Sequence, residues 1–297
     1  MSTTAPVAGV LPQAPWKKLF NEHISKMPTP HFVLSTVAAA PSDSPVPFVP
    51  RARFCIFRGF WTELPENQHN KAERNPKVYA SDCPTFTTDV RMEKVGQIFG
   101  SSAGHADDVE QTQGSGGGGP VEAVWWVEEV GTQWRIKGRA FVVANDIESG
   151  VESSGVRTVK SEVGKRMRLV DESKEGQWSW AKELTAIFGN QSPGIKGEYF
   201  LVQCIQSSIS KPSLGSFRAP PPGQPVNQPY DKDLELGAKV EDVNDAVARK
   251  NFRVVIIIPD SVEQTDLSDP SKARRFRYLF DGSIRANGGW RTVELWP

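Results

Sequence analysis

Basic side chains lie in three stretches of the sequence where they could bind an anion. The first, residues 52–60 (ARFCIFRGF), places Arg53 and Arg58 among aromatic and β-branched residues, just after Arg51. Any single arginine on a strand can simply face solvent, and this is the alternative interpretation. Arg53 and Arg58 lie five positions apart, so a regular strand sends them to opposite faces. They could share one ligand only across a strand end or a bulge, which Gly59 would allow.

The second stretch, residues 86–94 (FTTDVRMEK), indicates the end of a strand and the start of a helix, with Asp89 as the N-cap. First helical turns favour acidic side chains, because the helix dipole is positive there. Arg91 and Lys94 instead place two cations near this turn, a conflict that an anion bound at the helix start would relieve. Both cations, the threonine hydroxyls and free backbone N–H groups would then converge on one phosphate. The alternative is an exposed basic turn, partly compensated by Glu93.

The third stretch, residues 133–139, alternates polar or basic residues with apolar ones, beginning with Gln133. This period of two is typical of a half-buried strand. A glutamine on such a face can both donate to and accept from the edge of a flavin ring, although a solvated strand face explains the same pattern. Flavin mononucleotide (FMN) combines a phosphate, a ribityl chain and a flat apolar ring, and a cation-lined strand end beside a helix start suits such a cofactor.

Other kinds of chemistry find less support. The sequence has neither G-x-G-x-x-G beside a strand nor G-x-x-x-x-G-K-[ST], which argues against Rossmann and P-loop sites, and residues 114–120 (GSGGGGP) are interpreted as a linker. It also lacks G-x-S-x-G and H-E-x-x-H, and its histidines are scattered, with no evident partner for His23. Cys55 lies within a predicted strand and is interpreted as a small core residue. We therefore expect no metal site, and no catalytic acid or base can be named.

Composition narrows the class of protein further. Lys plus Arg equals Asp plus Glu at 35 each among 297 residues, unlike the excess of positive charge in nucleic-acid-binding proteins. Three isolated cysteines favour a reducing compartment. No apolar run approaches the length of a membrane span, and the N-terminus lacks the basic flank and apolar core of a secretion signal. We expect a cytoplasmic or nuclear protein that is not secreted and binds neither nucleic acid nor membrane.

Strands dominate the predicted elements, and helices are few. Helical spacing occurs at residues 16–27, 91–99 and 178–188, and strand patterns occur at 31–38, 49–61, 78–88, 121–127, 132–143, 252–258, 276–280 and 290–295. We expect a disordered tail at 1–14 and one domain over 15–297, with flexible insertions near 101–120, 145–176 and 206–249. The pattern suggests one closed or partly closed antiparallel barrel with flanking helices.

The order and spacing of these motifs resemble the pyridoxamine 5′-phosphate oxidase-like FMN-binding split-barrel family. The closest branch by motif is a little-characterised one with R-x-x-x-x-R-G-F followed by T-D-x-R-x-x-K, here residues 53–60 and 88–94. Residues 133–138 (QWRIKG) look like the glutamine-bearing strand of the family, and the chain end looks like its closing hairpin. The resemblance covers roughly residues 15–100, 121–144, 178–200 and 250–297. It implies a mainly β fold, an antiparallel Greek-key split β-barrel with long surface insertions.

The resemblance also implies a cofactor, a partner and residue roles. Carried over by position, Arg53, Arg58 and Lys94 would bind the phosphate and ribityl chain of FMN, and Thr88 would contact the flavin. Gln133 would reach the ring from the neighbouring protomer, because the cofactor of this family lies at the interface of a homodimer. Arginine suits such a role, since a guanidinium stays charged and can grip phosphate bidentately.

The sequence departs from the oxidase itself at three places. Met92 and Glu93 stand where a hydroxyl residue and a basic residue are expected, Leu267 stands in place of a tryptophan, and residues 294–297 (ELWP) replace an R-L-x-P ending. These changes weaken the case for pyridoxamine phosphate as the substrate more than the case for FMN.

The sequence therefore predicts an FMN-dependent oxidoreductase acting on an unidentified small molecule, with Arg275 and Arg277 as candidates for holding an anionic substrate. One alternative is a non-catalytic flavin-binding or sensing protein with the same fold. Two others are a split barrel that binds haem or a deazaflavin, and a cofactor-free scaffold that uses the insertions at 101–120 and 206–229.

Overall fold

The computed structural model describes residues 12–103, 112–191, 217–235, 240–282 and 286–297. Most of the predicted tail and parts of the predicted insertions near 101–120 and 206–249 lie outside these residues. Among the residues described, no helix is both long and apolar enough to cross a membrane.

Eight antiparallel strands form the main sheet, in the order β10-β9-β8-β6-β5-β1-β2, with β4 paired to β8 as well. Two further strands pair with each other, β3 (Tyr79–Ser81) and β7 (Met167–Leu169). The strands of the main sheet are β1 (His31–Ala39), β2 (Phe48–Ile56), β4 (Thr85–Asp89), β5 (Gly116–Val127), β6 (Thr132–Val143), β8 (Phe252–Asp266), β9 (Arg274–Phe280) and β10 (Trp290–Leu295). The predicted mainly β, antiparallel fold is confirmed.

The sheet closes into a barrel through β4. This strand pairs with the first part of β8, and on its other side it bonds to the chain that follows β2. There the Arg58 N–H donates to the Thr85 carbonyl at 2.8 Å, and the Thr85 N–H donates to the Gly59 carbonyl at 2.9 Å. The ring β2-β1-β5-β6-β8-β4 is thereby complete, while β9 and β10 continue the sheet from the far part of β8. The predicted continuous burial of residues 252–258 is confirmed.

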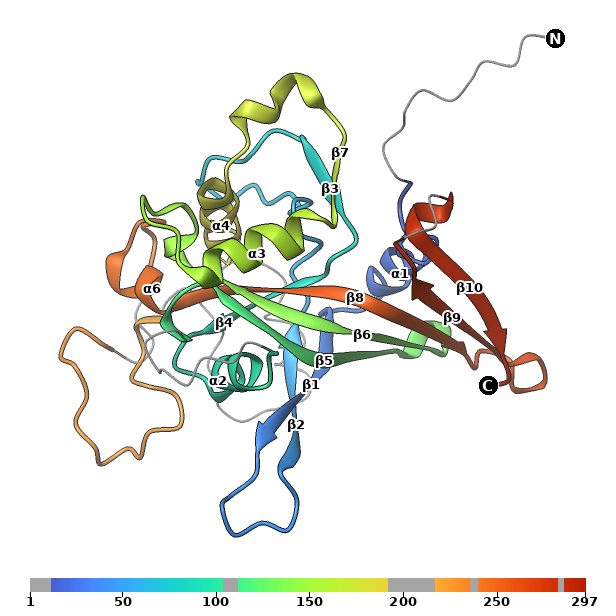
Figure 1. The fold of residues 1–297 in the computed structure, drawn as a ribbon, viewed down its shortest axis with the longest axis horizontal. Coiled ribbons are helices and arrows are strands. Elements are labelled where there is room, and N and C mark those ends of the chain that lie inside the picture. The colour runs from blue at the N-terminus through green and yellow to red at the C-terminus, as the bar shows by residue number, and fades with distance from the viewer. Residues whose placement is uncertain (1–11, 104–111, 192–216, 236–239, 283–285) are drawn as a thin grey trace.

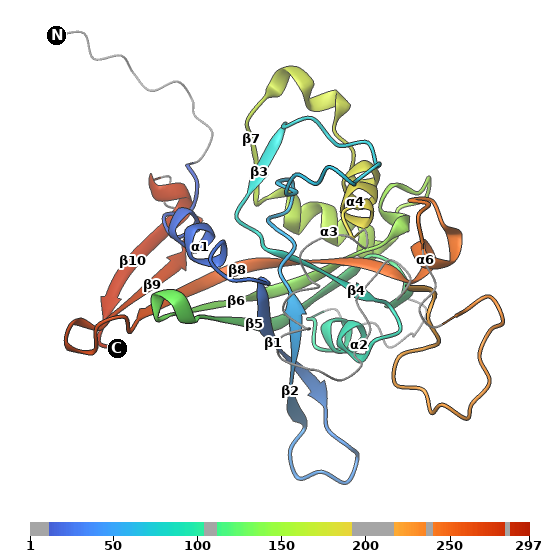
Figure 2. The same ribbon diagram turned by 180° about the vertical axis from the view of Figure 1, so that it is seen from behind.

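Helices cover the two sides of the long strands β5, β6 and β8 (Figures 1 and 2). On one side α2 packs against β5 and β1, and its apolar residues join the barrel core with Trp125 and Trp134. On the other side α3 and α4 enclose a second apolar cluster. The helices are α1 (Lys17–Ile24), α2 (Glu93–Gly100), α3 (Ser154–Gly164), α4 (Trp180–Gly189) and α6 (Ala246–Asn251), with short 3₁₀ turns at Glu128–Val130, Asn145–Glu148, Glu172–Gln177, Pro270–Lys272 and Ala286–Gly289.

Residues 145–176 form part of this second cluster, so the prediction that they are a flexible insertion without core residues is wrong. Val156, Val159 and Val163 of α3 are fully buried, at the spacing of one helical face. Polar residues dominate the composition of the segment, so the narrow apolar stripe was not recognised in the sequence.

The glycine run at residues 116–119 opens β5, so interpreting it as a linker is also wrong. A side chain at Gly119 would place its Cβ 2.5 Å from the Ile98 carbonyl oxygen of α2, which is far inside van der Waals contact. Glycine therefore allows α2 to lie directly on the sheet. This close packing sets the position of the residues at the start of α2.

Candidate cofactor site

Arg53 lies on β2 and is held in place by neighbours from two other elements. Its Nη1 donates to Thr36 Oγ1 of β1 at 2.6 Å, and its Nη2 donates to Gln97 Oε1 of α2 at 2.6 Å. The side chain is half-buried, and this burial lowers the pKa of the guanidinium. A hydrogen-bonded, partly desolvated arginine is well suited to binding an anion.

Lys94, in the first turn of α2, shares this neighbourhood. Its Nζ donates to Thr88 Oγ1 of β4 at 3.1 Å and lies 2.8 Å from Met92 Sδ. Burial lowers the pKa of Lys94, and Arg53 lowers it further, whereas Cys55 and the more weakly acting carboxylates of Asp89 and Glu93 raise it. The two cations are thus close enough to repel each other. Arg53 lies on the predicted strand and Lys94 in the first turn of the helix, and their binding of one phosphate stays a prediction.

Cys55 lies beside both cations but does not neutralise them. Its side chain is buried, as expected of a core residue, and burial raises the pKa of the thiol to about 11, although Lys94 and Arg53 act in the opposite direction. The thiol is therefore protonated and uncharged at neutral pH. The positive charge of the two cations remains available to a ligand.

Arg58 follows the end of β2, where the chain turns toward β4 at Gly59 (φ +101°). Its Nε is buried without a hydrogen-bond partner, and burial lowers the pKa of the side chain to about 10. A guanidinium nevertheless stays charged at neutral pH. Burial is the only cause of the lowered pKa of Arg58, with no contribution from Arg53 or Lys94, so the sharing of one ligand by the three cations stays a prediction.

These three residues have one property in common. Within the described parts of the chain, none of Arg53, Arg58 and Lys94 forms a salt bridge with a carboxylate at the 4.0 Å limit. We refer to these three residues as the unpaired cations. Burying a charge is costly unless an opposite charge compensates it, so an anionic ligand would stabilise this region.

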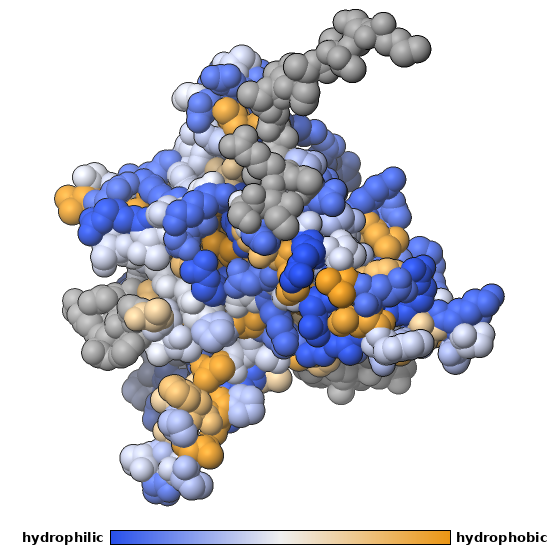
Figure 3. Space-filling view, turned by 45° about the vertical axis from the view of Figure 1, so that its right-hand side comes forward, coloured by the Kyte–Doolittle hydropathy of each residue, from blue (hydrophilic) through white to orange (hydrophobic). Residues whose placement is uncertain are grey.

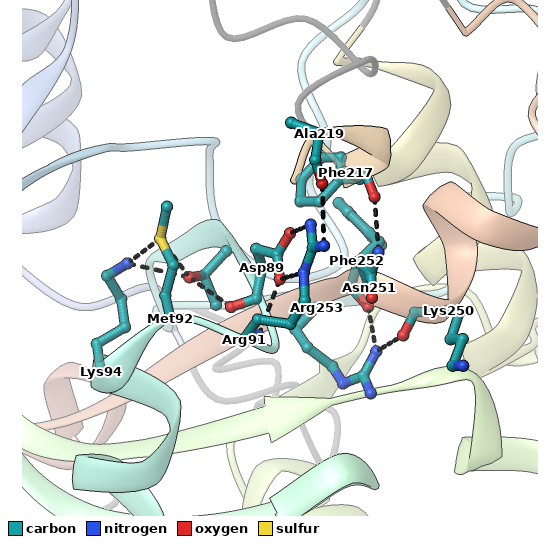
Figure 4. Close-up of polar contacts among 11 residues, drawn as sticks. Asp89, Arg91, Met92, Lys94, Phe217, Ala219, Lys250, Asn251, Phe252 and Arg253 are labelled. Atoms are coloured by element: carbon teal, nitrogen blue, oxygen red, sulfur yellow. Dashed lines mark hydrogen bonds and ion pairs between the residues drawn. The ribbon is translucent and has the colours of Figure 1, made fainter. Parts of the chain in front are cut away.

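Arg91 is placed differently from the unpaired cations. Its Nε and Nη2 donate to the two oxygens of Asp89 at 2.9 and 2.6 Å, and its Nη1 donates to the Ala219 carbonyl at 3.0 Å. Figure 4 shows Arg91 directed toward Asp89, whereas Lys94 extends toward Met92. Contrary to the prediction, Arg91 and Lys94 do not converge on one point in this structure.

The expected N-cap also differs. Asp89 accepts the backbone N–H of Arg91 at 2.8 Å, and Met92 occupies the N-cap position of α2 without a side-chain cap. The carboxylate forms a local turn and an ion pair instead of capping the helix. The N-cap prediction is therefore wrong, because the helix begins one turn later than the sequence suggested.

Thr88 and Gln133 lie on different parts of the barrel. Thr88 is buried at the end of β4, next to Lys94. Gln133 is half-buried on β6, in register with Trp126 of β5 and Thr265 of β8. The alternation predicted for this strand is confirmed by full burial of Trp134 and its neighbours on the inner face. No described contact joins Gln133 to the unpaired cations of its own chain.

Arg275 and Arg277 lie on β9 around one buried carboxylate. Arg275 Nε donates to Glu263 Oε2 at 3.1 Å, and Arg277 Nε donates to Glu263 Oε1 at 2.8 Å. Burial acts to raise the pKa of Glu263, but hydrogen bonds and attraction from both guanidiniums outweigh it and lower the pKa. One carboxylate thus compensates part of their charge, and their role in binding an anionic substrate stays a prediction.

The sequence analysis missed two residues at the site, Thr36 and Gln97. Gln97 follows Lys94 by three residues, so helical spacing alone could have placed it on the same face. Thr36 could not be found this way, because the register of β1 with β2 is not visible in the sequence. His23 also has a partner that was missed, since Trp134 Nε1 donates to its Nδ1 at 3.2 Å.

The residues present fit a phosphorylated ligand. The unpaired cations supply positive charge, the Nε of Arg58 is a buried donor without an acceptor, and Thr88 offers a hydroxyl group. Such donors match the several acceptor oxygens of a phosphate monoester. The expected site for the phosphate of FMN is therefore chemically plausible in this chain.

Three comparisons relate the chain to known proteins. The family model described as pyridoxamine 5′-phosphate oxidase, FMN-binding domain, matches residues 13–144, a segment that contains every predicted cofactor-binding residue. A crystal structure of a pyridoxamine 5′-phosphate oxidase-related, FMN-binding protein from Nostoc punctiforme is 16% identical, with a TM-score of 0.49, and the match covers 97% of this chain and 100% of that one. PhzG from Burkholderia lata, in complex with tetrahydrophenazine-1-carboxylic acid, is 14% identical with a TM-score of 0.38, over 96% and 94% of the two chains. No curated protein matches.

Proposed function

We propose that this protein is an FMN-dependent oxidoreductase. Residues 13–144 match the family model of the pyridoxamine 5′-phosphate oxidase FMN-binding domain, which supports the proposal. The observation that carries the proposal is the set of unpaired cations, which are partly desolvated and form no salt bridge among the described residues. Charged groups whose pKa is shifted by burial are candidates for functional sites. The substrate would be a small molecule of unspecified class.

The residues of the chain would bind and orient the cofactor. Arg53 and Lys94 would hold the phosphate from the barrel side and the helix start, Arg58 would donate through its free Nε, and Thr88 would contact the flavin. When bound, FMN supplies a ring that can accept a hydride, and the protein supplies position and electrostatics. A positive charge near the ring would also favour the anionic form of the reduced flavin.

A homodimer would complete the site. The outer face of the barrel exposes Phe48, Phe54 and Trp126, at 57%, 72% and 48% of their surface. Strand register places Phe54 beside Val33, Val33 beside Val124, and Trp126 beside Gln133, so apolar side chains and Gln133 share one face. Figure 3 shows hydrophobic residues gathered along the projecting β1–β2 hairpin. Exposed apolar surface of this kind favours a protein interface, and a second copy would bring its own Gln133 to this face.

The proposal is tested first by the absorbance spectrum of the purified full-length protein. We expect a yellow protein that releases FMN on denaturation, or a colourless one that binds added FMN with quenching of the flavin fluorescence. Riboflavin, which lacks the phosphate, serves as the matched ligand and should bind much more weakly. A colourless protein that also fails to bind added FMN would contradict the proposal that FMN is the cofactor.

A second measurement separates an oxidoreductase from a non-catalytic flavin-binding protein. The bound flavin is mixed anaerobically with candidate reductants, including reduced nicotinamides, and its bleaching is compared with that of free FMN. Faster bleaching of the bound flavin supports catalysis. Bleaching no faster than free FMN with every reductant supports the binding or sensing role.

A further inference from the structure

Three side chains from three elements form a closed ring of hydrogen bonds beside the proposed phosphate site. Thr36 Oγ1 of β1 donates to Gln97 Oε1 of α2 at 2.6 Å. Arg53 of β2 donates from Nη1 to Thr36 Oγ1 and from Nη2 to Gln97 Oε1, both at 2.6 Å. Each member therefore contacts the other two.

The ring fixes the orientation of the Gln97 amide. Both of its neighbours in the ring donate to it, so the oxygen must face Arg53 and Thr36, and the NH₂ group must face away. The Gln97 Nε2 indeed lies 3.4 Å from Glu93 Oε2, one turn earlier on α2. The amide thus serves Arg53 as an acceptor without adding a negative charge that would repel a phosphate.

The ring also fixes the guanidinium of Arg53. Its Nη1 makes additional contacts at 3.3 Å with the carbonyls of Leu34 and Arg51, so acceptors surround that end of the group. The Nε makes no hydrogen bond among the described residues and is available to a ligand. Holding a long side chain in its binding conformation before the ligand arrives reduces the entropy that is lost on binding.

Packing alone does not explain the polar members of this ring. Thr36 is 3% exposed, and a valine would fill the same space without a hydroxyl group that needs a partner. Gln97 shares α2 with Lys94, so its bonds also couple the helix start to β1 and β2. The ring therefore sets the distance between the two cations that would contact the phosphate.

We propose that Thr36 and Gln97 are positioning residues that hold Arg53 ready for the phosphate, so that the site selects phosphorylated flavins over riboflavin. This inference rests on the proposed function, since it assigns a selectivity to the same site. Neither residue needs to touch the cofactor. Their effect on binding would pass through Arg53.

The test uses Thr36→Val and Gln97→Met, which keep the approximate shape of each side chain and remove its hydrogen bonds. Dissociation constants for FMN and for riboflavin are measured on the full chain by flavin fluorescence. We expect each variant to weaken FMN binding about tenfold, equivalent to about 1.4 kcal/mol, and to leave riboflavin binding unchanged. Thr36→Ser keeps the hydroxyl group and should restore the preference for FMN.

Gly96→Ala is the matched control on the same helix. A Cβ at this position meets no atom within 4 Å, so both dissociation constants should stay at the wild-type values. Thermal melting shows whether each variant is folded. If Thr36→Val fails to fold, Gln97→Met decides the question, because Gln97 is only half-buried on a surface helix.

The outcomes separate this inference from the proposed function. Failure of the wild-type protein to bind FMN would overturn both. If the wild type prefers FMN to riboflavin and the folded variants keep the same preference, the positioning role is overturned and the FMN site stands. Equal weakening of FMN and riboflavin would also overturn it, because that pattern indicates a general packing defect.

Discussion

The unpaired cations and the arginine pair on β9 lie in different parts of the molecule and differ in how their charge is compensated. Arg275 and Arg277 both donate to Glu263, which is 5% exposed. Arg53 and Lys94 hydrogen-bond to the neutral groups Thr36, Gln97 and Thr88. Nearby carboxylates such as Glu93 attract them without forming a salt bridge. Burial acts on both regions, but only one has a carboxylate at its centre.

This difference separates a structural charge cluster from a candidate binding site. The carboxylate of Glu263 ties β8 to β9 and contributes to stability in the free protein. The unpaired cations are desolvated without a salt bridge to offset the cost, and groups of this kind are retained where they bind a ligand or take part in a mechanism. Residue type alone does not distinguish the two regions, whereas the partners of each cation do.

The largest effect is expected from removing two of the unpaired cations together. Arg53→Ala with Lys94→Ala should weaken FMN binding about 1,000-fold, because each charge-assisted hydrogen bond contributes about 1.5–3 kcal/mol. Riboflavin binding should change little, since it lacks the phosphate. Fluorescence titration with both ligands measures this selectivity.

Arg274→Ala is the control for that double variant. Arg274 is an exposed arginine paired with Glu294 at 2.9 Å, and its removal should leave the FMN affinity unchanged. Unchanged FMN affinity in the double variant would refute the phosphate site.

The second-largest expected effect is a change in stability caused by a substitution at Glu263, between the two arginines of β9. Glu263→Gln leaves two neighbouring guanidiniums without their shared carboxylate, which should lower the free energy of unfolding by about 2 kcal/mol. FMN affinity should stay near the wild-type value, since no described contact joins Glu263 to the unpaired cations. Urea denaturation measures the stability and FMN titration of the same sample measures the affinity. A loss of FMN affinity without a loss of stability would contradict the view that Glu263 is structural and lies outside the binding site.

Part of this arrangement could be predicted from the sequence. A period-two pattern identified β6, and a continuous apolar run identified the first part of β8. R-x-x-x-x-R-G-F with T-D-x-R-x-x-K indicated the strand and helix that carry Arg53 and Lys94. Local spacing was sufficient in these cases, because each motif lies within one element or across one turn.

The rest depended on contacts between distant segments. Arg91 binds Asp89 instead of extending toward an anion, because the local turn and the Ala219 carbonyl hold its side chain there. Ala219 lies 128 residues away in the sequence, so local spacing could not reveal this contact. The glycines at 116–119 looked like a linker because composition does not reveal that α2 packs directly against them. Thr36 joined the site only through strand register.

A substitution at Lys94 should change the stability less than Glu263→Gln does, and in the opposite direction. Lys94→Met removes a desolvated charge that has no carboxylate partner among the described residues, so the ligand-free protein should become more stable by about 1 kcal/mol. The same variant should bind FMN more weakly, in contrast to Glu263→Gln. Thermal melting without and with FMN measures both, and a clear loss of stability in the ligand-free variant would contradict the view that Lys94 is held at a cost.

The smallest effect is a dependence on pH that follows from the lowered pKa of Lys94. Between this lowered pKa and the ordinary lysine value of about 10.4, the unfolded chain binds more protons than the folded one, so the stability of the ligand-free protein should rise with pH. FMN favours protonated Lys94, so its affinity should fall by less than tenfold over the same window. Titrations at several pH values check this fall against Lys94→Met, in which the affinity should fall less steeply, because Arg58, whose pKa is lowered to about 10, still titrates in this window. If the variant and the wild type show the same slope, the titrating group is not Lys94, and its proximity to the phosphate loses this support.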